Sequence, residues 1–266
     1  MSLRINTNIE AFNAHRQLAQ TSDRASKSME RLSSGYRINR AADDAAGLAI
    51  SEKLRGQIRG LGQAQRNAQD AVSLVQTAEG SLNEVHSMLQ RVRELAVQYA
   101  NDTLSTSDRA AITAEAAQLQ SEIERIGTSA DFNGIKLLDG SRDTISFQVG
   151  ANDGDTIAVT TESLGEQVGA IDVSDTGNAI SAIDVAIEAV STMRSTFGAV
   201  QNRLEHTMNN LATYQENLTA SESRIRDVDM ASEMVEFSKD QILQQAGTSM
   251  LAQANQAPQA VLSLLR

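Results

Sequence analysis

Apolar residues recur along most of this chain at alternating steps of four and three positions. This spacing is typical of α-helices that pack lengthwise against other helices. The clearest run extends from about Ala45 to Asn101 and carries two adjacent apolar stripes. Two stripes on one helix indicate contact with more than one neighbour, as in a bundle. At 1.5 Å per residue this helix would be on the order of 80 Å long, which predicts an elongated rod.

Two further internal helices show the same spacing. The apolar positions from Ile112 to Ile126 predict a helix with Ser105 or Ser107 as its N-cap and Gly127 as its stop. A longer helix is predicted over residues 178–225, where polar residues interrupt the apolar stripe. The expected fold class is therefore mainly α, built from long antiparallel helices of coiled-coil character.

The pattern changes between residues 131 and 177. Asn133-Gly134 and Asp139-Gly140 are turn dipeptides, and apolar and polar residues alternate on both sides of the turn-rich residues 150–154. This alternation predicts one β-hairpin near residues 144–160. We expect it to be the only strand-like region and to be followed by a polar linker.

Both ends of the chain carry an amphipathic stripe. The N-terminal stripe comprises Ala11, Ala14, Leu18, Ala25, Met29 and Leu32, and the C-terminal stripe comprises Met250, Ala254, Ala257, Val261 and Leu264. Neither helix is apolar enough to be stable alone in water, so we expect the N- and C-terminal helices to pair. Because a two-helix pair leaves apolar surface exposed, the stripes also predict assembly with further copies of the chain.

Composition limits the possible folds, partners and chemistry of the chain. Aromatic residues make up 3% of the 266 residues, and Pro258 is the only proline, which favours uninterrupted helices over a β-sandwich or barrel. The net charge of −11 disfavours binding to nucleic acid. The chain has no cysteine, which excludes disulfides, zinc–thiolate sites and thiol catalysis. No membrane helix or cleaved secretory signal is expected, because no apolar stretch is long enough.

Candidate chemistry is sparse. His15, His86 and His206 are scattered without the spacing of a metal site. The pair Asp43-Asp44 is better explained as a helix cap and a salt-bridge former than as catalytic carboxylates. We therefore expect no enzyme activity, no cofactor and no metal.

Several local motifs occur in a characteristic order. They are Leu3-Arg4-Ile5-Asn6-Thr7-Asn8-Ile9, residues 31–35, residues 38–50, residues 89–98, Phe132-Asn133-Gly134, residues 148–154, residues 229–233 and residues 253–256. Together they resemble bacterial flagellin over nearly the whole chain. The middle is too short for the variable outer domains of longer family members, so the resemblance implies a short form.

The resemblance implies a structural subunit that polymerises into the extracellular flagellar filament for motility. It implies export without a cleaved signal peptide, through the flagellar type III apparatus, and assembly beneath a cap. Residues 1–45 with 226–266 would form a helical inner tube, and residues 46–225 an outer tube with the hairpin. The further implied partners are an export chaperone that binds residues 231–266 and the cap and junction proteins.

The resemblance also implies particular contact residues. Arg91, Leu95 and Gln98, with Glu115 on the neighbouring helix, would contact other subunits and, on the monomer, Toll-like receptor 5 of the innate immune system. The residues expected to assemble the inner tube are Ile5, Ile9, Leu18, Met29, Leu32, Met250, Val261 and Leu264. Two alternatives are a hook–filament junction protein, which has similar terminal helices, and a cytoplasmic coiled-coil scaffold.

Overall fold

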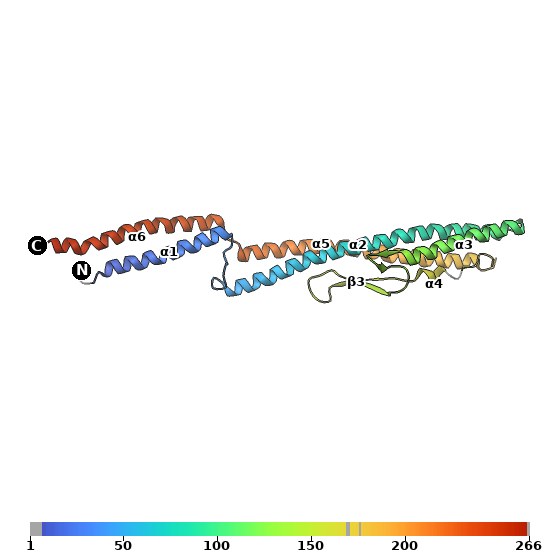
Figure 1. Ribbon diagram of the computed structural model, residues 1–266, viewed down its shortest axis with the longest axis horizontal. Coiled ribbons are helices and arrows are strands. Elements are labelled where there is room, and N and C mark those ends of the chain that lie inside the picture. Colours follow the sequence, from blue (N-terminus) through green and yellow to red (C-terminus); the bar gives the residue numbers. More distant parts are fainter. Residues whose placement is uncertain (1–6, 169–170, 176, 265–266) are drawn as a thin grey trace. The chain divides into compact units, whose positions relative to one another are not determined.

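A computed structural model describes residues 7–168, 171–175 and 177–264, and the described part is mainly α-helical (Figure 1). The helices are α1 (Ile9–Ser34), α2 (Ala45–Tyr99), α3 (Thr106–Ser129), α4 (Leu164–Val168), α5 (Ala179–Arg226) and α6 (Met230–Leu264). The strands are β1 (Asp131–Phe132), β2 (Ile135–Lys136), β3 (Thr144–Gln148) and β4 (Thr156–Thr160). The predicted fold class is confirmed.

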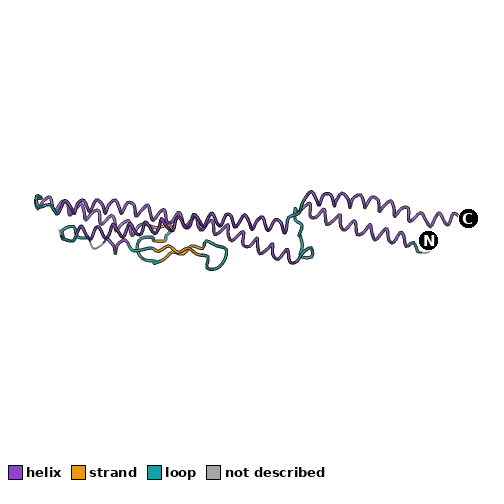
Figure 2. Tube along the Cα trace, turned by 180° about the vertical axis from the view of Figure 1, so that it is seen from behind, coloured by secondary structure: helices purple, strands orange, loops and turns teal. Residues whose placement is uncertain are grey.

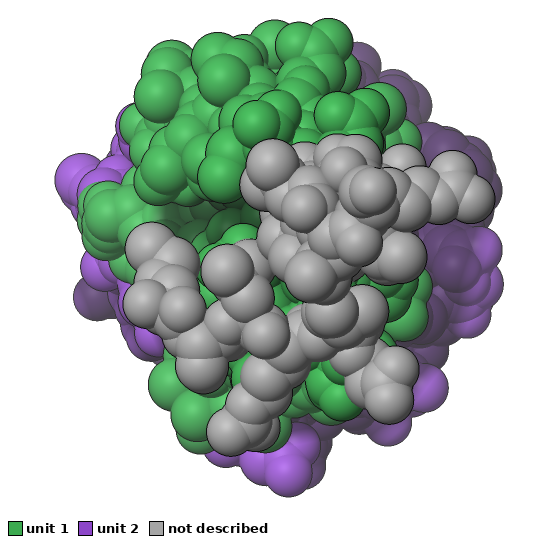
Figure 3. All heavy atoms as spheres, turned by 90° about the vertical axis from the view of Figure 1, so that its left-hand side faces the viewer, with its two compact units in different colours: residues 1–56, 217–266 green, residues 57–216 purple. Residues whose placement is uncertain are grey.

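The chain divides into two compact units, coloured green and purple in Figure 3. Unit 1 comprises residues 1–56 and 217–266, and so contains α1 and α6. Unit 2 is the continuous segment of residues 57–216, which contains α3, α4 and all strands. Helices α2 and α5 each contribute residues to both units.

Helices α1 and α6 of unit 1 lie side by side as an antiparallel pair (Figures 1 and 2). Arg24 Nε lies 3.7 Å from Asp240 Oδ1, and Arg31 Nη1 lies 3.6 Å from Glu233 Oε2. Residue numbers therefore rise along α1 as they fall along α6. The predicted pairing of the terminal helices is found in the structure.

The ends of α1 are set by local chemistry. The Asn8 side chain accepts a hydrogen bond from the Ala11 N–H at 3.0 Å, which satisfies one of the free amides at the helix start. Gly35 closes the helix at φ +74°, a left-handed conformation that glycine adopts without steric cost.

Unit 2 has a continuous apolar core contributed by α2, α3, α5 and the β-hairpin. On α2 the buried positions repeat every seven residues, as the apolar pattern predicts. They are Leu61, Ala68, Val75, Leu82, Leu89 and Ala96. Facing side chains from α5 include Phe197 and Leu204, which are almost fully buried.

The hairpin β3–β4 lies within the predicted residues 144–160, in the orange strands of Figure 2. Ile145 pairs with Val159 and Phe147 pairs with Ile157, so apolar side chains share the face that packs on the core. A second, two-residue pair β1–β2 flanks Asn133-Gly134, where both residues have positive φ. The expectation of a single strand region is wrong, because two-residue strands are too short to show alternation.

Two further sequence expectations differ from the structure. Helix α3 ends at Ser129 rather than at Gly127. Gly127 is buried, and a Cβ added at this position would lie 3.4 Å from the Leu164 side chain. Gly127 is therefore a buried residue within the helix rather than a helix stop. The expected polar linker instead contains α4 and buries Leu164, Val168, Ile171 and Val173 in the core of unit 2. Leu164, Val168 and Ile171 are separated by steps of four and three, but so short a run does not show whether another element covers it, so only tertiary packing reveals the role of these residues.

Candidate assembly surfaces

Unit 1 exposes many large apolar side chains. Among the described residues of unit 1 these are Ile9, Phe12, Met29, Tyr36, Ile50, Met230, Met234, Val235, Ile242, Leu243 and Met250. The described part of unit 2 exposes only Val97, Val185 and Tyr214 in this class. Phe12, Val235 and Ile242 are each about two-thirds exposed or more, at 70%, 68% and 67%. An apolar surface of this extent marks a site of association.

The α1–α6 contact itself buries mostly small or polar side chains. The buried residues of α1 are Thr21, Ala25 and Ser28, and α6 buries the carboxylate of Asp240. Of the described hydrophobic residues in unit 1, Ala25 and Ile38 alone are buried. Because apolar burial is the main stabilising term in folding, this pair has little to hold it together by itself.

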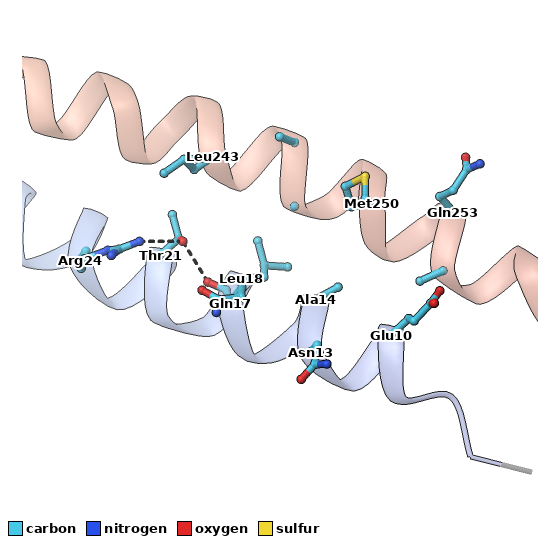
Figure 4. Close-up of a pocket in the computed structure, with 13 residues that line it drawn as sticks. Glu10, Asn13, Ala14, Gln17, Leu18, Thr21, Arg24, Leu243, Met250 and Gln253 are labelled. Atoms are coloured by element: carbon cyan, nitrogen blue, oxygen red, sulfur yellow. Dashed lines mark hydrogen bonds between the residues drawn. The ribbon is translucent and has the colours of Figure 1, made fainter. Parts of the chain in front are cut away.

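A groove of about 740 Å³ lies between α1 and α6 (Figure 4). Leu18 borders it from α1, and Leu243 and Met250 border it from α6. Gly247 allows the helices to approach here, because a Cβ at this position would lie 3.2 Å from Leu18 Cδ1. The amide of Asn8 donates a hydrogen bond of 2.7 Å to the Ala254 carbonyl near one end of the groove.

The residues expected in the inner tube differ in accessibility. Ile9, Met29 and Met250 are exposed, at 54%, 55% and 63%, whereas Leu18 and Leu32 are partly buried. Ile5 lies outside the described residues, and Val261 and Leu264 lie on α6 with side chains outside the described part.

Phe12, Val235 and Ile242 were not among the predicted residues, although they are the most exposed large side chains of the pair. They fall beside the single stripe that the periodicity traces on each helix. The sequence could have indicated these exposed residues, because a single stripe on each helix does not include all the large apolar residues of α1 and α6.

Arg91 forms the centre of an exposed charge cluster in unit 2. Its Nη2 and Nε atoms donate to Glu115 Oε1 at 2.9 and 3.1 Å, and its Nη1 donates to Glu94 Oε2 at 2.9 Å. These hydrogen bonds raise the pKa of Arg91, and the bond with Glu115 has the largest effect. The cluster joins α2 to α3, and Gln98 is also exposed on α2.

Leu95 does not share that surface. The expectation grouped it with Arg91 and Gln98 as a contact residue, but its side chain is 1% exposed and belongs to the core. Four positions on a helix correspond to a rotation of about 40°, which is enough to turn Leu95 away from solvent. The structure therefore brings Arg91 and Glu115 together and separates Leu95 from them.

The connection between α1 and α2 contacts the connection between α5 and α6. Tyr36 and Asp227 form an isolated antiparallel bridge, and the Arg226 guanidinium lies 4.9 Å from the Tyr36 ring centroid. Arg226 Nη1 also forms an ion pair of 2.8 Å with Glu52. Arg226 is thus held between an aromatic face and a carboxylate, which orders the two connections together.

The two consecutive aspartates cap the local backbone, as expected. Asp44 accepts a hydrogen bond of 2.8 Å from the Gly47 N–H in the first turn of α2. Asp43 accepts from the N–H groups of Arg40 and Asn39, and the Arg40 bond in particular lowers the pKa of Asp43. The expected close salt bridge of these aspartates is not found among the described residues.

Neither a metal centre nor a bilayer span emerges from the described residues. No three described His, Asp or Glu side chains are grouped so that they could ligate a metal ion. None of the helices, over their described residues, combines the length and apolarity needed to cross a bilayer. Long helices with exposed apolar side chains are typical of a structural protein that associates with other chains.

Comparison with known proteins supports this class. Residues 5–143 match the bacterial flagellin N-terminal helical region, and residues 180–265 match the bacterial flagellin C-terminal helical region. A flagellin of Halalkalibacterium halodurans is 57% identical, over 98% of this chain and 99% of the relative. The flagellar filament 33 kDa core protein of Treponema phagedenis is 49% identical, over 98% and 99%. The crystal structure of Bacillus cereus flagellin is 34% identical and covers 55% of this chain and 88% of its own, with a TM-score of 0.51.

The chain belongs to the bacterial flagellin family. It is therefore a structural subunit of the flagellar filament and not an enzyme. Matches over essentially full-length flagellins favour this assignment over a hook–filament junction protein or a cytoplasmic scaffold.

Proposed function

We propose that copies of this chain polymerise through the apolar surfaces of α1 and α6. Residues 1–45 with 226–266 would form an inner tube, and residues 46–225 an outer tube. The observation that carries this proposal is the exposure of Phe12, Val235 and Ile242 on a helix pair that lacks a core.

Assembly would supply the apolar burial that unit 1 lacks. Burial of accessible apolar surface stabilises by roughly 25 cal/mol per Å². Covering the large side chains of several neighbours therefore offsets the cost of ordering two long helices. Unit 1 would fold fully only on assembly, whereas unit 2 has its own core. Coupling of this kind makes the stability of the helices depend on subunit concentration.

Charge substitutions on α1 and α6 test the proposal. In the full chain, Phe12→Asp or Ile242→Asp places an ionised group where a neighbour would exclude water, which is strongly unfavourable. We expect sedimentation and electron microscopy to show loss of filaments, with little change in the thermal unfolding of unit 2. Val185→Asp is the matched control, because Val185 is 61% exposed but lies on α5 in unit 2. Unimpaired polymerisation by both α1 and α6 variants would contradict the proposal.

We further propose that the chain reaches the cell exterior unfolded, through the flagellar type III apparatus and without a cleaved signal peptide. A chain with no cysteine and one proline avoids disulfide formation and, apart from one bond, slow proline isomerisation. An export chaperone would cover residues 231–266, whose exposed apolar side chains include Val235 and Leu243. Deletion of this segment should abolish both chaperone binding and filament growth, whereas retained polymerisation would contradict its assigned role.

The cap and junction proteins would bind the same surfaces at the two ends of the filament. A subunit at either end lacks neighbours on one side, so part of its apolar surface remains uncovered. Val235→Asp should therefore weaken binding to these proteins together with polymerisation.

Recognition of the monomer by Toll-like receptor 5 is proposed for the exposed surface formed by Arg91, Glu115 and Gln98. Arg91 donates two hydrogen bonds to Glu115 Oε1 and so provides a charged feature at this surface. Because Leu95 is buried, a Leu95→Ala change would test stability rather than contact. The informative variant is Arg91→Ala with Gln98→Ala, which should reduce receptor signalling several-fold. Arg125→Ala on α3, where the arginine pairs with Glu122, is the control. Unchanged signalling by the folded double variant would remove this proposal.

A further inference from the structure

The described methionines fall into two structural groups. Met29, Met230, Met234 and Met250 expose 55%, 48%, 49% and 63% of their surface. All four lie on α1 or α6 in unit 1. In unit 2, Met193 is 5% exposed, and Met88 and Met208 are partly buried against the core.

The exposed methionines lie among the apolar residues of the α1–α6 pair. The contacts Arg24–Asp240 and Arg31–Glu233 fix the antiparallel register and place Met29 level with Met234 and Val235. Met250 borders the groove beside Leu18 (Figure 4). The thioethers are therefore distributed along the surface that the proposed function assigns to subunit contacts.

We propose that these four methionines are oxidative modification sites that control whether a free subunit can assemble. The oxidant class is a hydroperoxide, and this inference rests on the proposed function. The thioether sulfur attacks the terminal peroxide oxygen, the O–O bond breaks, and the proton of the transferred oxygen passes to the leaving hydroxide or alkoxide, which leaves a sulfoxide. The sulfur loses two electrons, and the peroxide is reduced to water or, for an organic peroxide, to an alcohol.

A sulfoxide is incompatible with close apolar packing. The thioether is flexible and apolar and fits irregular contacts, whereas the sulfoxide is polar and carries a strong hydrogen-bond acceptor. Buried between subunits without a donor, that acceptor loses its water without replacement. The chain contains no cysteine, so no thiol of its own competes for the oxidant. Assembly would cover the four thioethers and protect them.

The first measurement is the oxidation rate at each methionine. Full-length monomer is treated with hydrogen peroxide and analysed by peptide mass spectrometry over time. We expect Met29, Met230, Met234 and Met250 to be oxidised several-fold faster than Met193. In preformed filaments their rates should fall towards that of Met193. Equal rates at exposed and buried positions in the monomer, or unchanged rates in the filament, would overturn the inference.

The second measurement is seeded polymerisation of the oxidised monomer. We expect elongation to fall several-fold and to recover after treatment with methionine sulfoxide reductases. A variant with all four exposed methionines changed to leucine should polymerise and resist peroxide. The matched variant, with Met88, Met193 and Met208 changed to leucine, should remain sensitive. Equal peroxide sensitivity of the two variants would overturn the inference.

The two proposals can fail separately. If untreated wild-type monomer does not elongate seeds, the proposed function fails. If it elongates normally but oxidised monomer elongates equally well, only the methionine inference fails.

Discussion

Individual carboxylates organise the start of helices in this protein. At the start of α3 the Ser105 hydroxyl donates to Asp108 Oδ2 at 2.6 Å, and the Ser105 N–H donates to the same oxygen at 3.1 Å. The Ser105 oxygen in turn accepts from the Asp108 N–H at 3.3 Å. These reciprocal bonds form a capping box and lower the pKa of Asp108, mainly through the hydroxyl.

The depressed pKa of Asp108 leads to a pH-dependent prediction. The contribution of this carboxylate is fully present above the unfolded-state pKa of about 3.9 and is lost as pH falls through the lower folded-state pKa. Asp108→Asn should therefore lower stability at neutral pH and reduce its acid dependence below about pH 4. Urea unfolding at several pH values measures both effects. Asp153→Asn, at an exposed hairpin-turn position, is the control. An identical acid dependence in wild type and Asp108→Asn would contradict this role.

At the scale of elements, α1 and α6 differ from the helices of unit 2 in what they bury. The long helices of unit 2 present Leu, Val, Ile and Phe to a shared core. The α1–α6 contact instead relies on small residues, close approach at Gly247 and two long ion pairs. Ion pairs with an exposed partner contribute little, so these contacts add little to the stability of the helix pair.

Gly247 provides a direct test of this close approach. Gly247→Leu would place a large side chain against Leu18 and force the helices apart, at a cost of about 1–3 kcal/mol. We expect faster amide hydrogen exchange along α1 in the monomer and a reduced polymerisation rate. Gly80→Leu is the matched control, because a Cβ at that helical position meets nothing within 4 Å. Unchanged exchange in Gly247→Leu would show that the groove accommodates the side chain without separating the helices.

At the scale of the whole molecule, one chain combines a unit with a core and a unit without one. Unit 2 is a single continuous segment, and its core includes residues from α2, α3, α5 and both strands of the hairpin. Unit 1 is assembled from both ends of the chain and exposes most of its large apolar residues. Under the proposed function, this division would separate the part that folds within the subunit from the part that joins subunits.

A fragment of residues 57–216 tests the division. We expect it to unfold cooperatively in urea, because it retains the apolar core, and to remain monomeric in sedimentation at concentrations where the full chain polymerises. A fragment without cooperative unfolding would show that unit 2 needs the terminal helices. A fragment that forms filaments would show that assembly does not need α1 and α6.

Much of this organisation follows from local sequence. The seven-residue repeat of Leu61, Ala68 and Val75 suffices to predict α2, because each position returns to the same side of a helix. The cap at Ser105 and the hairpin register are likewise set by neighbouring residues. The two terminal stripes also predict an antiparallel helix pair that leaves apolar surface exposed.

Only tertiary packing decided which apolar residues are available to a partner. Leu95 and Phe12 both occur in amphipathic helices, yet one is 1% exposed and the other 70% exposed. Periodicity reports the direction of a side chain around its own helix, but not whether another element covers that side. Unit 2 places α3 and α5 against α2, whereas α1 has α6 on one side. The sequence therefore determined the helices and their apolar stripes, and the three-dimensional arrangement determined which stripes remain uncovered.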